Sequence, residues 1–63
     1  MAQETYRYYC LDRAGHLHSA EWFNADSDED AIAQIEALYP NALCEIWKAG
    51  RLVAKLSPRR LQA

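Results

Sequence analysis

Residues 26–40, DSDEDAIAQIEALYP, decide the fold because they carry the signals of one short helix between two extended regions. Asp26 or Ser27 can cap the helix start, since each has an acidic residue three positions later, and acids in the first turn suit the helix dipole. Apolar residues then recur at helical spacing: Ala31, Ile32, Ile35, Leu38 and Tyr39. Pro40 disfavours helical geometry at Tyr39, so we expect a helix of about three turns that ends there.

Two extended runs precede this helix. Residues 5–11, TYRYYCL, and 16–23, HLHSAEWF, are rich in β-favouring residues, and the turn-like sequence DRAG lies near their junction. They predict a β-hairpin in one of two registers: a three-residue loop pairs Leu11 with Leu17, whereas a four-residue loop pairs Cys10 with Leu17. The side chains that we expect to face the core alternate along the first run: Tyr6, Tyr8 and Cys10.

Two more extended runs follow the helix. Residues 43–47, LCEIW, and 51–56, RLVAKL, flank Lys48-Ala49-Gly50, a three-residue loop whose glycine suits the left-handed position of a hairpin with a bulge. In this register two pairs face the core, Ile46 with Leu52 and Cys44 with Ala54. Two pairs face outward, Trp47 with Arg51 and Glu45 with Val53, near Lys55.

The order β-β-α-β-β predicts an α+β fold, a single small domain with a four-stranded antiparallel sheet and one helix on one face. The chain of 63 residues has no room for a second domain. We expect the domain over residues 5–56, a disordered N-terminus over 1–4 and a mobile basic tail over 57–63. One helix covers one face, so the other is left to water or a partner. We expect that face to carry Arg7, Tyr9, Trp22, Trp47, Arg51, Val53 and Lys55.

Composition indicates a globular protein of the cytoplasm. No apolar run approaches the ~20 residues of a membrane span, and residues 1–7 are polar where a signal peptide is apolar. In such a compartment thiols stay reduced, so Cys10 and Cys44 are expected to be small buried hydrophobes on two strands, with a disulfide or a redox role as the alternative.

The pattern of the whole chain also resembles a known group. The aromatic first strand ending Leu11-Asp12, the acidic helix start at 26–31, and Glu45-Ile46-Trp47 followed by Gly50-Arg51-Leu52 are similar to short uncharacterised bacterial β-β-α-β-β proteins, frequent in alphaproteobacteria and classed as hypothetical proteins or domains of unknown function. The resemblance spans residues 5–56. It implies a stand-alone cytoplasmic bacterial domain and carries no activity or catalytic residue.

Metal binding and catalysis find little support. His16 and His18 alternate on a strand, and Cys10 lies across the hairpin from His18 in one register, but zinc needs three or four converging N or S ligands. The hydroxyl and thiol groups lack a nearby histidine and carboxylate that would activate them. We therefore expect no enzyme activity, no cofactor and no metal.

Two functions are left for the uncovered face. Trp, Tyr and Arg are enriched at interface anchors, so the preferred hypothesis is a protein-interaction module that self-associates, as a homodimer, or binds another protein through this face or an edge strand. The alternative is single-stranded nucleic-acid binding, in which Tyr9, Trp22 and Trp47 stack bases. Its cations would be Arg51, Lys55, Arg59 and Arg60, although the net charge of −2 weakens it. No membrane partner is expected.

Overall fold

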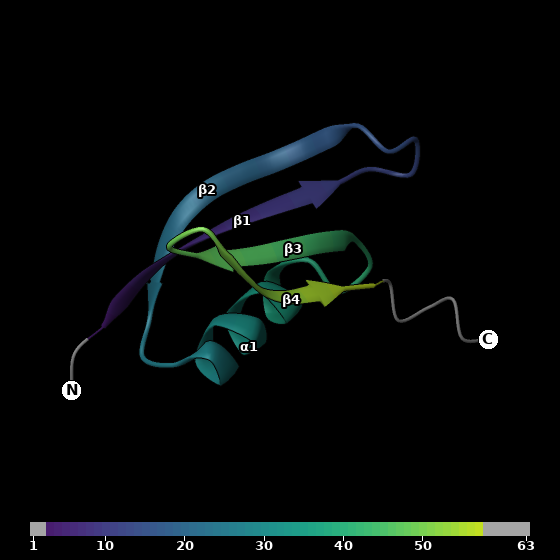
Figure 1. Cartoon of the computed structure of the whole chain (residues 1–63). Helices are drawn as coiled ribbons and strands as arrows, with labels where there is room; N and C mark the ends of the chain where they lie inside the picture. Colours follow the sequence, from purple (N-terminus) through teal and green to yellow (C-terminus); the bar gives the residue numbers. More distant parts are fainter. Residues whose placement is uncertain (1–2, 58–63) are drawn as a thin grey trace.

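The computed structural model describes residues 3–57, where one antiparallel sheet carries one helix on one face (Figure 1). The elements are β1 (Glu4–Leu11), β2 (Leu17–Ala25), α1 (Asp28–Leu38), β3 (Leu43–Lys48) and β4 (Arg51–Leu56). The strand order β2-β1-β3-β4 joins the two hairpins through their first strands, β1 and β3. The predicted α+β class and element order are confirmed. The sheet starts at Glu4, one position before the expected domain start, and the predicted tail from residue 58 onward lies outside the described residues.

The helix begins and ends close to the predicted positions. Ser27 is the N-cap, and its Oγ accepts a hydrogen bond from the Asp30 backbone N–H at 3.1 Å. Asp30 Oδ2 accepts in turn from the Asp26 backbone N–H at 3.0 Å. Tyr39 is the C-cap, as expected for the residue before Pro40.

The apolar stripe of the helix is narrower than the spacing predicts. Ala31 and Ile35 are buried, whereas Ile32 and Tyr39 are only partly buried against the core. Leu38, in the last turn, is 63% exposed and lies outside the buried part of the stripe that the spacing predicts.

The first hairpin combines one predicted pair with a bulge. Leu11 is paired with Leu17, as the three-residue loop predicts, but a bulge at His18 shifts the next pair, so Cys10 lies opposite Ser19. The turn before it is held by Asp12, whose Oδ1 accepts hydrogen bonds from two backbone N–H groups at 2.9 Å each. The core-facing set of Tyr6, Tyr8 and Cys10 is confirmed.

The second hairpin has a tighter turn than predicted. Lys48 pairs with Arg51, which leaves a two-residue turn of Ala49 and Gly50, both with positive φ (53° and 79°). Two-residue turns with positive φ match the twist of the flanking strands, which is why this register forms. A bulge at Val53 then places Ala54, and not Leu52, opposite Ile46.

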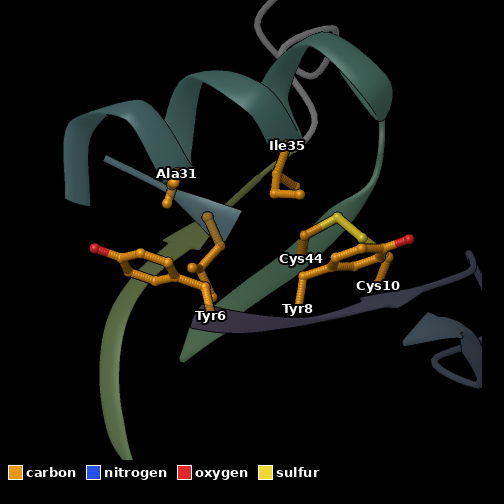
Figure 2. Packing of buried hydrophobic residues seen from close by; sticks show 8 residues of the cluster. Tyr6, Tyr8, Cys10, Ala31, Ile35 and Cys44 are labelled. Atoms are coloured by element: carbon orange, nitrogen blue, oxygen red, sulfur yellow. A yellow bond between two sulfur atoms is a disulfide. The ribbon is translucent and has the colours of Figure 1, made fainter. Parts of the chain in front are cut away.

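The core lies between the sheet and α1 (Figure 2). It consists of two tyrosines, two isoleucines, two cysteines and two alanines: Tyr6, Tyr8, Cys10, Ala25, Ala31, Ile35, Cys44 and Ile46. Cys10 and Cys44 are direct cross-strand partners on β1 and β3 and form a disulfide. The expected burial of both cysteines is confirmed, but the expected reduced thiols are wrong in this structure, because the register of β1 with β3 brings the two side chains together.

Candidate protein-interaction face

The sheet face that α1 leaves uncovered, called here the open face, is organised in rows across the strands. Residues paired across neighbouring strands share a face, so the register defines its members. The first row is Trp22, Arg7, Trp47 and Leu52, and the second is Ala20, Tyr9, Glu45 and Lys55. A third row, at the turn of the first hairpin, is Leu17, Leu11 and Leu43. Most of these side chains are apolar, and only three carry a charge.

Arg7 lies at the centre of the first row. Its guanidinium carbon is 4.7 Å from the centre of the Trp22 ring and 5.3 Å from that of Tyr9. Its Nε donates a hydrogen bond to the Tyr9 hydroxyl at 3.1 Å. These contacts hold Arg7 half-buried, whereas Trp22, on the edge strand β2, stays 65% exposed. The stack therefore presents one face of an indole and a fixed guanidinium to solvent.

Trp47 forms the opposite wall of a shallow pocket. Its indole Nε1 donates to Glu45 Oε1 at 3.1 Å, which fixes the ring along its own strand. The pocket encloses about 550 Å³ and is lined by Arg7, Tyr9, Trp22, Glu45, Trp47, Ala49 and Gly50. The turn of the second hairpin thus closes one end of it. A volume of this size accepts a few side chains of a partner or a small ligand.

The leucine row borders a second, smaller pocket of about 320 Å³. Leu17 and Leu43 are 60% and 47% exposed, and Leu52 in the first row is 41% exposed. Exposed apolar side chains thus occur in the first and third rows, and the row of Ala20, Tyr9, Glu45 and Lys55 lies between them.

Five of the seven residues predicted for this face lie on it, but Arg51 and Val53 do not. Arg51 Nη2 lies 3.7 Å from Asp28 Oδ2 at the start of α1, and Val53 packs against the core. The two-residue turn and the bulge at Val53 are the physical reason, because each changes which β4 residues face the helix. Arg7 makes the cation–π contacts of the open face, with the rings of Trp22 and Tyr9.

Several residues of this face were missing from the prediction. They are Leu11, Leu17, Ala20, Leu43 and Leu52, whereas Glu45 lies on this face as its predicted outward orientation requires. Alternation along β1 and β3 carries the signal for two of them, since Leu11 shares the parity of Tyr9, and Leu43 shares that of Trp47. Leu17 and Leu52 follow only once both bulges are known.

Two tyrosine hydroxyls on the helix side form hydrogen bonds with other side chains. Burial and a 2.8 Å hydrogen bond to Asp28 Oδ1 raise the pKa of the Tyr6 hydroxyl. The hydrogen bond between the Tyr8 and Tyr39 hydroxyls, 3.1 Å long, and burial raise the pKa of Tyr8 to about 12. Tyr8 is thus a neutral hydrogen-bonding group at physiological pH.

Within residues 3–57 no cluster of three or more His, Cys, Asp or Glu side chains is arranged to hold a metal ion. His18 Nδ1 lies 3.1 Å from its neighbour Ser19 Oγ, on the exposed edge strand. In the same described part of the chain, no helix has the length and apolar character to cross a membrane.

The fold and the open face define a small antiparallel α+β domain with one aromatic, arginine-containing surface. No protein family, curated protein or solved structure matches the chain. The resemblance to short bacterial proteins stays a prediction.

Proposed function

We propose that the protein is a small, non-enzymatic interaction module that binds a protein surface through the open face. The observation that supports this most is the 65% exposure of Trp22 beside Arg7, in one row with Trp47 and Leu52. Trp, Tyr and Arg are the residues most enriched among interface anchors. A domain of this size also has a thin core, so covering an apolar face stabilises it.

The open face is a better candidate than the edge strands. β2 and β4 are the edges of the sheet, and each contains a bulge, at His18 and at Val53. Bulges interrupt the regular row of backbone groups that an added strand pairs with, and proteins use them to protect edges. Binding through side chains of the open face needs no such row.

The sequence and the disulfide indicate different compartments. The sequence predicts a cytoplasmic protein, and the Cys10–Cys44 disulfide weighs against a reducing environment, because disulfides persist mainly in oxidising compartments. Rapid acid quenching of cells, followed by alkylation and mass measurement, distinguishes a cytoplasmic from an exported protein. In a cytoplasmic protein both thiols are alkylated, whereas in an exported protein both are protected.

The experiment that tests the function uses a photo-crosslinking amino acid in cells. One variant carries it at position 22 on the open face, and the control carries it at Ala37, an exposed position on α1. We expect crosslinks to protein from position 22 and none from position 37. The crosslinked protein is then purified and titrated, and Trp22→Ala with Trp47→Ala must abolish binding, whereas Leu38→Ala, which removes an equally exposed apolar side chain from the helix, must not.

Two results would contradict the proposal. The absence of any crosslink specific to position 22 removes the open face as an interaction surface. A nuclease-sensitive crosslink to nucleic acid supports the alternative of single-stranded nucleic-acid binding instead. Arg51, one of the cations of that alternative, lies on the helix side. Glu45 adds a negative charge to the open face, which nucleic acid would have to contact.

A further inference from the structure

We infer that the surface covering the open face is the open face of a second copy, with Arg7 of each copy paired to Glu45 of the other. This inference rests on the proposed function and names its partner. It starts from the charges on a face that is otherwise mostly apolar. These are Arg7, Glu45 and Lys55.

Arg7 and Glu45 are held in position by hydrogen bonds to aromatic side chains and not by ion pairs. Within residues 3–57 the ion pairs are Lys48 with Glu4 and Arg51 with Asp28. Arg7 uses its Nε for Tyr9, and Glu45 uses Oε1 for the Trp47 indole. Among the residues that the structure describes, the terminal nitrogens of Arg7 and the second oxygen of Glu45 make no hydrogen bond or ion pair, so we assign them to a group on the second copy. A carboxylate is the partner that a guanidinium fork fits best.

The two charges lie on a diagonal of the face. Arg7 is opposite Trp47, and Glu45, two residues earlier on β3, is opposite Tyr9. A two-fold axis between two facing sheets that exchanges Arg7 with Glu45 brings each charge over its opposite. Trp47 and Tyr9 form the other two corners of this group and come close to the axis. Each of these rings therefore packs on its own copy in the second chain. A face with a single sign of charge is not self-complementary in this way, and self-complementarity is what a symmetric dimer requires.

The size of the face sets the strength of this dimer. The four strands contain 8, 9, 6 and 6 residues. At a rise of about 3.3 Å and a spacing of about 4.8 Å, they give the sheet a face of roughly 460 Å². A standard interface buries about 800 Å² of accessible surface per partner, and a flat footprint of this size leaves room for at most one small interface, which we expect to be reversible. We therefore expect a dissociation constant in the micromolar range or above.

The test is a charge exchange measured by sedimentation equilibrium of the full chain at about 50 mM salt, up to about 1 mM protein. Arg7→Glu and Glu45→Arg are each prepared alone, and Arg13→Glu, in the exposed turn of the first hairpin, is the control for the change in net charge. Each single variant puts like charges together twice in its own dimer, so we expect association at least about tenfold weaker than wild type. Arg13→Glu keeps the wild-type affinity.

The decisive sample is an equimolar mixture of the two single variants. In the mixed dimer the carboxylate introduced by Arg7→Glu in one chain faces the guanidinium introduced by Glu45→Arg in the other, and the unaltered Arg7 and Glu45 face each other. We expect the mixture to associate within about threefold of wild-type affinity. Because the two substitutions are never combined in one chain, circular dichroism of each variant alone shows that it is folded.

The outcomes separate this inference from the proposed function. A wild-type dimer whose two variants do not complement each other overturns the Arg7–Glu45 pairing. A wild-type monomer at about 1 mM, with position 22 crosslinking to a different protein in cells, overturns the second copy as partner and leaves the interaction module standing. A monomer without crosslinks overturns both.

Discussion

Reduction of the Cys10–Cys44 disulfide is predicted to remove most of the stability of the protein. The bond closes a loop with a sequence separation of 34 residues. In the chain-entropy model, closing a loop of this length in the unfolded state stabilises the native state by about 4 kcal/mol. A domain of 63 residues has a total free energy of unfolding of about 3–9 kcal/mol, so the bond accounts for a large part of it.

Thermal unfolding followed by far-ultraviolet circular dichroism, with and without a phosphine reductant, measures this contribution. In a domain of this size about 4 kcal/mol corresponds to a fall in Tm of about 15–30 °C. The control is Cys10→Ala combined with Cys44→Ala, which unfolds at the same temperature with and without reductant. Mass measurement after alkylation confirms that both thiols are free in the reduced sample.

A reduced protein whose Tm stays within about 3 °C of the oxidised one would contradict this contribution of the disulfide. In that case the β1–β3 ladder and the buried thiols alone hold the two central strands together. Loss of the folded state in the double alanine variant but not in the reduced protein would assign the effect to the cavity left by two buried sulfur atoms.

Three further predictions concern packing, the turn and pH. Ile35→Ala, at a position of 1% exposure, is expected to lower the free energy of unfolding in urea by about 2–5 kcal/mol. Leu38→Ala, at 63% exposure on the same helix, is expected to lower it by less than about 0.5 kcal/mol. Equal losses in the two variants would contradict the burial of Ile35. Ala49→Gly removes a side chain from a residue with φ 53° and is expected to raise stability by about 1 kcal/mol in the same assay, a loss being the opposing result. The pKa of Tyr8 is raised from 10.0 to about 12 in the folded protein, so its contribution to stability is complete below pH 10 and is lost as pH rises toward 12. Absorbance titration of tyrosinate at about 295 nm should show this late step in the wild type and not in Tyr8→Phe. A Tyr8 that titrates at its ordinary pKa would contradict the hydrogen bond with Tyr39.

Local sequence signals predicted the elements and one face of the sheet. The helix follows from the capping residues near Ser27 and the breaker Pro40, both of which act within one turn of the chain. The buried alternation of Tyr6, Tyr8 and Cys10 follows from the period of a strand. These features depend on neighbours in the sequence, and the structure agrees with them.

The candidate site was predicted less completely, because its membership depends on register. Trp22, Arg7 and Trp47 were assigned to the open face from strand parity, but that they form a single row depends on the pairing of β1 with both β2 and β3. Arg51 and Val53 were misplaced by the choice of a three-residue loop. The positive φ of Ala49 that permits the shorter turn is uncommon for alanine, and nothing in the local sequence indicates it.

The sequence by itself determined that one three-turn helix serves four strands, and hence that one sheet face lacks a cover. Only the tertiary structure decided what that face presents. The order β2-β1-β3-β4 brings residues from distant parts of the chain together, and the bulges at His18 and Val53 set which side chains point outward. The same pairing of β1 with β3 joins Cys10 to Cys44 under the sheet and places Arg7 diagonal to Glu45 above it. Strand pairing is non-local, and a shift of one residue exchanges the two faces, so composition and periodicity alone do not specify it.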